Sequence, residues 1–129
     1  MSAPLPKPTE LSQPHWDGCR AGVLRVQRCR ACGAHVFIPQ PLCTSCSRDA
    51  LEWVESRGLG SVYSFTVVHR APHPSFATPY VIAIVALDEG FEMLANLACE
   101  PARAAIGKRV RVAFRAASEQ IALPYFIPL

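Results

Sequence analysis

The spacing of four cysteines is the feature that most constrains how this 129-residue chain can fold. Two Cys-x-x-Cys pairs, with ten residues between them, are formed by Cys29, Cys32, Cys43 and Cys46. Each pair can turn as a tight knuckle, and a ribbon between the knuckles can close a tetrahedron of thiolates around a metal. Gly33 follows the first pair, where a residue without Cβ lets backbone N–H groups turn toward the sulfurs. Soft thiolate ligands predict zinc, with iron in a rubredoxin-like site as the alternative.

A site with four protein ligands has no open position for water, so the expected role of the metal is structural. The surrounding segment is too short for a large core, and metal binding would supply most of its folding free energy, on the order of 10 kcal/mol. His35 lies between the pairs and is expected to be a surface residue. Two disulfides are the other possibility, which an expected cytoplasmic location disfavours, because no apolar secretory signal is recognisable in the first residues.

Composition narrows the class of protein further. Half of the residues are hydrophobic, which is enough for a packed core. No apolar run reaches the roughly 18–20 residues of a membrane-spanning helix, so no membrane association is expected. The formal net charge of +3 is too small to demand a polyanionic partner.

The chain divides into three expected segments: an N-terminal arm and helix at 1–28, a zinc ribbon at 29–56 and an OB-fold at 57–129. Prolines at the start of the arm favour an extended conformation. A short helix is expected from Ser12, its N-cap, to Gly22.

The expected helix places Trp16, Cys19 and Arg20 on one face. A strand at 23–27 follows it, and the ribbon ends in a helix-poor tail at Trp53 and Val54.

After Arg57 the sequence becomes a series of short strands bounded by Gly, Pro or charged turn residues. These strands are expected at 60–70, 79–88, 91–99, 108–116 and 120–127. Asp88 and Glu89 belong to a tight turn and are expected to be solvated. Five short strands with a longer loop at 72–79 suit a small closed barrel of the OB type. The predicted fold is therefore mainly β: a short helix, a four-cysteine zinc ribbon and a five-stranded OB-fold barrel.

The remaining reactive side chains indicate no catalytic site. Cys19 and Cys99 are expected to be small buried hydrophobic residues. His69 and His73 lie in or beside the longest loop, where a structural hydrogen-bonding role is the more common one. Three arginines share one expected strand face, which is solvated by default and could also meet phosphates; they are Arg109, Arg111 and Arg115.

The motifs VQRCRACG, CTSCS and PYVIAIVALDEG, following HWDGCRAG, resemble the acyl-CoA-associated family of rubredoxin-like zinc-ribbon/OB-fold proteins. The resemblance covers residues 16–126 and matches the family's metal ligands at the four ribbon cysteines. It implies a non-catalytic accessory subunit of thiolase-superfamily enzymes: sterol-carrier-protein-type thiolases, acyl-CoA aldolases or synthases. In such complexes the partner supplies the catalytic residues, and the small subunit stabilises it and can help to enclose the CoA thioester.

This resemblance also suggests where acyl-CoA or the partner would be contacted. We expect the loop from His69 to Tyr80 to lie near the acyl-CoA channel, with Phe76 and Tyr80 as apolar contacts. Arg109 and Arg111 are the expected phosphate neighbours. The proline-rich arm and the C-terminal ALPYFIPL are further expected partner contacts, because small domains rarely leave such apolar tails uncovered.

Two other function classes stay open at this point. The first is a nucleic-acid-binding zinc-ribbon/OB module, although Lys7 and Lys108 are the only lysines and the basic stripe is short. Salt-dependent binding to an oligonucleotide would identify it. The second is a free-standing acyltransferase or hydrolase that uses Cys99 or His69, which thioesterase activity lost on Cys99→Ala would identify.

Overall fold

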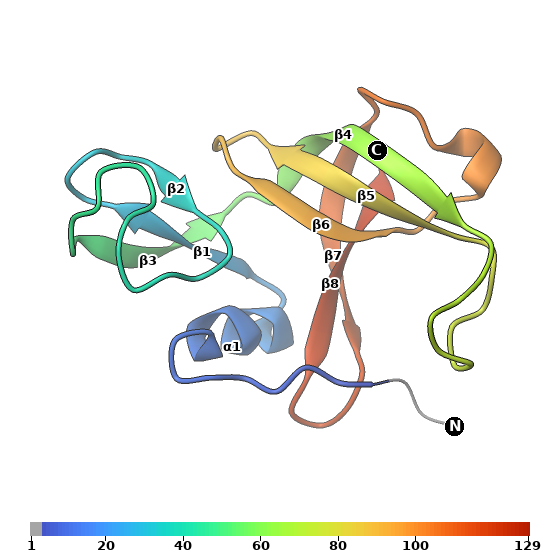
Figure 1. Ribbon diagram of the computed structural model, residues 1–129, viewed down its shortest axis with the longest axis horizontal. Helices are drawn as coiled ribbons and strands as arrows, with labels where there is room; N and C mark the ends of the chain where they lie inside the picture. Colours follow the sequence, from blue (N-terminus) through green and yellow to red (C-terminus); the bar gives the residue numbers. More distant parts are fainter. Residues whose placement is uncertain (1–3) are drawn as a thin grey trace.

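The computed structural model describes residues 4–129, so the first three residues of the expected arm lie outside the described residues. A ribbon sheet lies beside a β-barrel, and a helix lies against both (Figure 1). In chain order the elements are α1 (Gln13–Ala21), β1 (Leu24–Cys29), β2 (His35–Val36), β3 (Leu51–Ser56), β4 (Leu59–Val68), β5 (Tyr80–Leu87), β6 (Glu92–Leu97), the 3₁₀ helix η1 (Pro101–Arg103), β7 (Arg109–Ala116) and β8 (Ala122–Pro128). No helix within residues 4–129 has the length and apolarity needed to cross a bilayer.

The ribbon is a three-stranded antiparallel sheet in the order β2-β1-β3. The tail that was expected only to be helix-poor is the strand β3, which pairs with β1 along its whole length, from Leu24 opposite Ser56 to Cys29 opposite Leu51. β1 crosses the expected boundary between residues 28 and 29, and the division of the chain into three segments stays a prediction.

The second half of the chain forms the predicted five-stranded closed barrel, in the order β4-β5-β6-β8-β7. β7 closes it by pairing with the start of β4, where Leu59 lies opposite Arg111. The expected strand ends differ from the observed ones by up to two residues. The mainly β fold, with one short helix in the described residues and a barrel after the cysteine ribbon, is confirmed.

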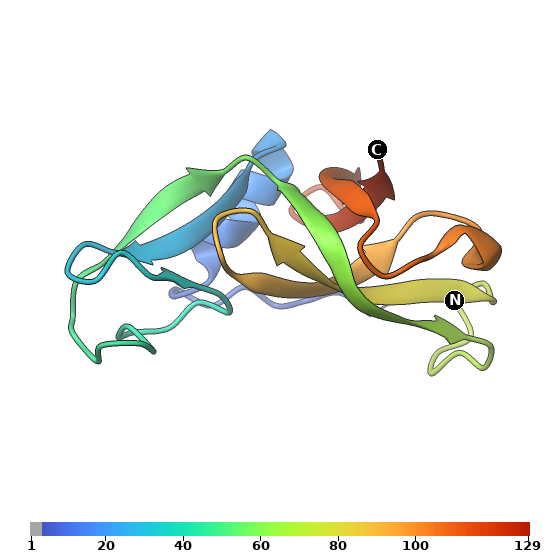
Figure 2. The ribbon, with the colours of Figure 1, turned by 90° about the horizontal axis from the view of Figure 1, so that it is seen from above.

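A single hydrophobic core joins the ribbon to the barrel. Leu24 and Val26 of β1 are almost fully buried and pack in the same cluster as Val62, Val85 and Phe126 of the barrel. Figure 2 shows β1 reaching alongside the start of the barrel at the point where β3 runs into β4. Because burial of side chains this size stabilises a fold by about 1.5–3 kcal/mol each, the two β-units hold each other in a fixed relation.

The helix α1 begins after Ser12 and ends at Gly22, as predicted, but its buried face is not the expected one. The buried residues are His15, Gly18 and Cys19, whereas Arg20 is exposed and Trp16 is only half-buried. Gly18 makes the close approach possible, since a Cβ there would lie 2.7 Å from the carbonyl oxygen of Val23. Gly18 therefore lies against Val23 and Arg25, and the Trp16 indole does not occupy this contact.

The expected N-cap also differs in detail. Ser12 stands at the N-cap position, but its hydroxyl makes no bond to the first turn of α1. It accepts hydrogen bonds from the backbone N–H and the hydroxyl of Thr9 instead, at 2.9 and 3.0 Å. These bonds turn the N-terminal segment back along the helix.

Candidate metal centre

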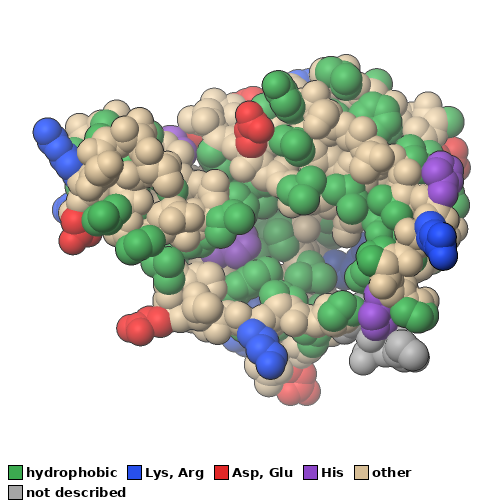
Figure 3. All heavy atoms as spheres, in the orientation of Figure 1, with side chains coloured by type: hydrophobic (Ala, Val, Ile, Leu, Met, Phe, Trp, Pro, Cys, Tyr) green, Lys and Arg blue, Asp and Glu red, His purple; other side chains and the backbone are tan. Residues whose placement is uncertain are grey.

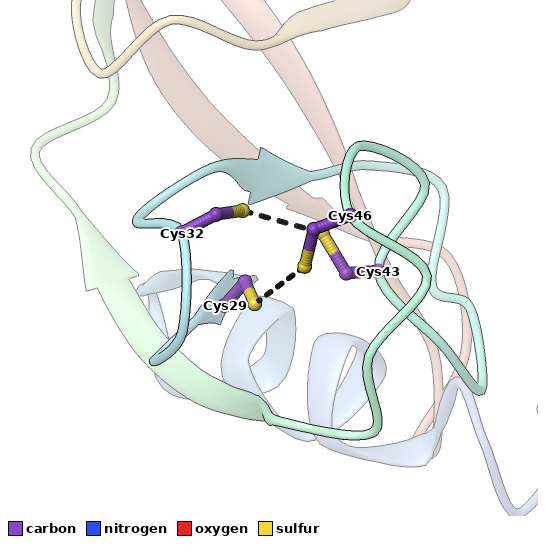
Figure 4. Close-up of side chains that lie close together, drawn as sticks. All are labelled: Cys29, Cys32, Cys43 and Cys46. Atoms are coloured by element: carbon purple, nitrogen blue, oxygen red, sulfur yellow. Dashed lines mark hydrogen bonds between the residues drawn. The ribbon is translucent and has the colours of Figure 1, made fainter.

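The four ribbon cysteines converge on one point between the two knuckles (Figure 4). All four sulfurs lie within 4.8 Å of one another, and the Cys29–Cys46 and Cys32–Cys43 pairs are each 3.6 Å apart. Tetrahedral bonds of about 2.3 Å to zinc would separate the sulfurs by about 3.8 Å. A disulfide needs sulfurs about 2.05 Å apart, so the arrangement fits a metal and not a disulfide pair.

The two knuckles share one backbone conformation. The N–H of Gly33 donates to the carbonyl of Cys29 at 2.8 Å, and the N–H of Ser47 donates to the carbonyl of Cys43 at 2.9 Å. Both Gly33 (φ 80°) and Ser47 (φ 66°) adopt the left-handed conformation directly after the second cysteine of their pair. The role expected for Gly33 is therefore repeated at Ser47, where a side chain is tolerated at some cost in strain.

Backbone N–H groups favour the thiolate form of the first cysteine of each pair, Cys29 and Cys43. The N–H groups of Cys46 and Ser45 lower the pKa of the Cys43 thiol to about 6. Those of Cys32 and Ala31 lower the pKa of Cys29 in the same way.

The pKa of Cys46 shifts in the opposite direction from those of Cys29 and Cys43. The Arg48 N–H favours its thiolate, but burial and the three neighbouring sulfurs together raise the pKa of Cys46 to about 11. Four crowded sulfurs cannot all ionise without a cation, and a divalent metal would supply that charge.

Most of the thiolate site is shielded from solvent, and it has no open coordination position. Cys29 and Cys43 are buried, Cys46 is half-buried, and only Cys32 is exposed. Four thiolates saturate a tetrahedral ion. These features fit a structural metal and leave no coordination site for a substrate.

A buried glutamine supports the loop between the knuckles, and sequence reasoning missed it. Gln27 is 4% exposed; its amide donates to the carbonyl of Gln40 at 2.9 Å and accepts from the Gln40 N–H at 2.7 Å. The two bonds hold the proline-containing loop 37–42 against β1. A polar residue next to buried Val26 was the only signal of this role in the sequence.

Aromatic rings connect the ribbon to the barrel and the helix. His35, expected on the surface, stacks on Phe91 with ring centroids 6.0 Å apart, and Phe91 also meets Phe37 at 6.1 Å. Phe37 in turn meets the buried ring of His15 at 5.5 Å. His35 is half-buried, so it does lie at the surface, but one face of its ring packs against the turn between β5 and β6.

The structure brings part of the expected acyl-CoA loop together. Phe76 lies 5.8 Å from the ring of His73 and 6.1 Å from the ring of Tyr80, and His73 Nδ1 lies 2.7 Å from the hydroxyl of Ser75. His69 is exposed directly after β4. The rings of His73, Phe76 and Tyr80 thus form a small cluster.

The two expected phosphate neighbours have different surroundings. Arg109 makes a two-bond ion pair with Asp88, with both N–O distances 2.8 Å, which lowers the pKa of Asp88. Arg111 has no ion pair within residues 4–129 and lines a cleft with Arg57 and Glu55. Arg111 is consequently the more available of the two cations.

The turn residue Glu89, expected to be solvated, instead joins the ribbon to the barrel. One of its carboxylate oxygens accepts from the Ser56 hydroxyl at 3.0 Å and from the Arg57 N–H at 2.8 Å. These are the residues through which β3 passes into β4. Their separation of more than 30 positions from Glu89 explains why local sequence patterns did not reveal the contact.

Comparisons with known proteins agree with this architecture. The family model described as "ChsH2, rubredoxin-like zinc ribbon domain" matches residues 16–52, and "ChsH2, C-terminal OB-fold domain" matches residues 53–115. A chain of the solved "Ltp2-ChsH2(DUF35) aldolase" is 34% identical, with a TM-score of 0.86, over 96% of this chain and 98% of that one. The likeness therefore extends over nearly the full length of both chains.

Curated relatives carry several names. A "Probable enoyl-CoA hydratase alpha subunit" from Thermomonospora curvata is 40% identical over 81% of this chain, which spans only 33% of that protein. A "DUF35 domain-containing scaffold protein" from Methanocaldococcus jannaschii is 36% identical over 78% of this chain and 71% of its own length. "Benzoylsuccinyl-CoA thiolase subunit BbsA" from Geobacter metallireducens is 35% identical over 57% of this chain and 49% of its own.

Both family models, the aldolase chain and the scaffold protein share the order of ribbon and barrel and much of the sequence. The chain belongs to the ChsH2/DUF35 family of rubredoxin-like zinc-ribbon/OB-fold proteins.

Proposed function

We propose that this chain is a non-catalytic accessory subunit that binds and stabilises a thiolase-superfamily enzyme acting on acyl-CoA. The observation that carries the proposal is the likeness of this chain, over nearly its full length, to one chain of the solved Ltp2-ChsH2(DUF35) aldolase, whose name joins two proteins. The names of the scaffold protein and of the thiolase subunit BbsA support the same role.

The chemistry of the described residues supports a subunit without its own active site. The one cluster of metal-ligating side chains found in residues 4–129 is the closed set of four thiolates. We propose that it holds Zn²⁺, with iron as the alternative, and that the ion has a structural role. Bound there, the ion would fix both knuckles and the loop between them.

The acyl-CoA contacts are proposals as well. The cluster of Phe76 and Tyr80, with His69 at the start of the same loop, would offer apolar surface to an acyl chain. Arg111 would meet a CoA phosphate directly, whereas Arg109 would have to share its guanidinium with Asp88. A cytoplasmic location fits these roles and remains an expectation.

An acyl-CoA hydratase is a second candidate for the partner. The hydratase alpha subunit from Thermomonospora curvata supports it, although the chain spans about one third of that protein and leaves the rest without a counterpart here. The nucleic-acid alternative is not favoured, because a stacking platform needs exposed aromatic residues beside positive charge and the described strands β5 and β6 carry no basic residue.

Co-purification tests the proposed function. The tagged chain is isolated from its native cell extract, and the proteins that accompany it are identified by mass spectrometry and quantified. A thiolase-superfamily protein in roughly equal amount is the expected result. A hydratase in its place would support the second candidate, and nucleic acid or a ribonucleoprotein would contradict both.

A further inference from the structure

The outer surface of three barrel strands forms a largely apolar face that no other element within residues 4–129 covers. Side chains alternate along β5, with Val81, Val85 and their neighbours pointing into the barrel and Ile82 and Ile84 pointing out. Ile84 lies directly opposite Leu94 on β6. We call the outward residues of β4, β5 and β6 the outer barrel face; they are Ser64, Thr66, Val68, Tyr80, Ile82, Ile84, Ala86, Glu92, Leu94 and Asn96.

This face is accessible, and Glu92, which lies opposite Ala86 at the start of β6, is its one charged residue. Leu94 is 70% exposed. Apart from Glu92, the stretches 63–68, 80–87 and 92–97 contain no Lys, Arg, His, Asp or Glu. In the space-filling view, hydrophobic side chains gather over β4, β5 and β6, with an acidic side chain among them (Figure 3).

The position of the face within the fold points to binding. In OB-folds the second and third barrel strands, with the loop between the first and second, form the ligand-binding surface. In this chain those elements are β5, β6 and the loop 69–79, so the aromatic cluster of His73, Phe76 and Tyr80 continues the outer barrel face at one end. A face that binds nucleic acid needs positive charge to meet phosphates, and the three strands provide none.

We propose that the outer barrel face is the surface by which this chain docks onto an apolar surface of its acyl-CoA enzyme; the inference rests on the proposed function. With Glu92 at one end as its only charged side chain, the rest of the face complements an uncharged protein surface, because an ionised group brought against it would be desolvated without a partner. The outer barrel face therefore suits the apolar centre of a protein–protein interface and does not suit a polyanion such as nucleic acid.

Its area argues for a larger partner and against a second copy of this chain. With strands about 4.8 Å apart and about 3.3 Å per residue, three strands of about six residues cover roughly 300 Å². A stable interface buries about 800 Å² on each partner. Two copies meeting face to face would fall well short, whereas a larger enzyme can cover this face together with the loop 69–79.

Site-specific photo-crosslinking tests the location of the contact. A photoreactive amino acid replaces Leu94 in one variant and Ile106 in another, and the full chain is irradiated in its native cells. Ile106 is a matched control, since it is 72% exposed and lies outside the outer barrel face, between η1 and β7. We expect an adduct with an acyl-CoA enzyme from position 94 and at least tenfold less from position 106.

Adducts of a different kind would overturn the proposal: a second copy of this chain or nucleic acid at position 94, or equal yields of the enzyme at both positions. The wild-type co-purification separates the two claims. If it recovers no acyl-CoA enzyme, the proposed function itself fails; if it recovers one that position 94 does not contact, only the docking face is wrong.

A pair of charge variants provides the second measurement. Because both side chains are exposed, we expect Leu94→Glu and Ile106→Glu to have the circular dichroism spectrum and the metal content of the wild type. Recovery of the enzyme is expected to fall at least tenfold with Leu94→Glu, since a charge would be buried without a partner, and to stay within twofold with Ile106→Glu. Unchanged recovery with Leu94→Glu would contradict the docking face.

Discussion

Gly58 holds the junction between the ribbon and the barrel, and its replacement by alanine should be strongly destabilising. It adopts φ 70°, and a Cβ would overlap Val112 Cγ1 on β7. A left-handed conformation costs a residue with a Cβ about 1–2 kcal/mol, and overpacking costs about 1–3 kcal/mol more. We therefore expect Gly58→Ala to lower the free energy of unfolding by about 2–5 kcal/mol.

Gly107→Ala is the matched control for this prediction. Gly107 has φ 87°, but a Cβ there would meet no atom within 4 Å, so only the backbone cost of about 1–2 kcal/mol applies. Thermal unfolding of the metal-loaded proteins, followed by circular dichroism, measures both, with about 4 °C expected per kcal/mol for a chain of this size. Equal losses from the two variants would refute the reasoning, because the contact with Val112 would then carry no cost.

Three further perturbations test other parts of the structure. Glu89→Ala should lower the free energy of unfolding by about 1–3 kcal/mol, because the Ser56 hydroxyl and the Arg57 N–H lose their acceptor. In the exposed control Glu92→Ala, chemical denaturation should show a change within about 0.5 kcal/mol. Similar values for the two variants would argue against the contact of Glu89 with Ser56 and Arg57. Cys32→Ser should abolish stoichiometric metal binding, unfold the ribbon and prevent recovery of the enzyme; a variant that lost the metal and still bound its partner normally would contradict the structural role. Burial lowers the pKa of His15, so its contribution to stability is complete above the unfolded pKa of about 6.5 and declines as the pH falls through the folded pKa. The wild type should therefore lose more stability than His15→Phe between about pH 7.5 and about pH 5.5, and parallel losses in urea titrations would be evidence against it.

Local sequence patterns were sufficient for the metal-binding cysteines and for most of the barrel. The Cys-x-x-Cys spacing encodes the knuckles directly, because each knuckle closes within five residues. Alternation in β7 and the turn residues around β5 and β6 likewise depend on near neighbours, and the observed strands lie within two residues of the expected ends.

Features that depend on distant contacts could not be read from the sequence. β3 becomes a strand because β1 offers it a pairing edge, and Glu89 finds its donors more than 30 residues away. The buried face of α1 is set by how closely Gly18 approaches Val23 O, which helical spacing does not specify. The role of the Gln27 amide likewise depends on the loop that folds over it and brings the backbone of Gln40 within hydrogen-bonding distance.

The burial of β5 shows a related limit. Its nearly continuous apolar sequence suits a central strand, and β5 does pair with a neighbour on each side. Yet one side of the strand faces outward, with Ile82 and Ile84 only half-buried. Hydrophobicity in the sequence marks surface that needs covering, and it does not distinguish a core of the chain itself from an interface with another protein.

Native mass spectrometry of the assembly purified through the tagged chain tests the central claim most directly. The account predicts a complex in which each copy of this chain carries one metal ion and is matched by a thiolase-superfamily protein. A metal-free chain that remains alone, or one bound to nucleic acid, would contradict it.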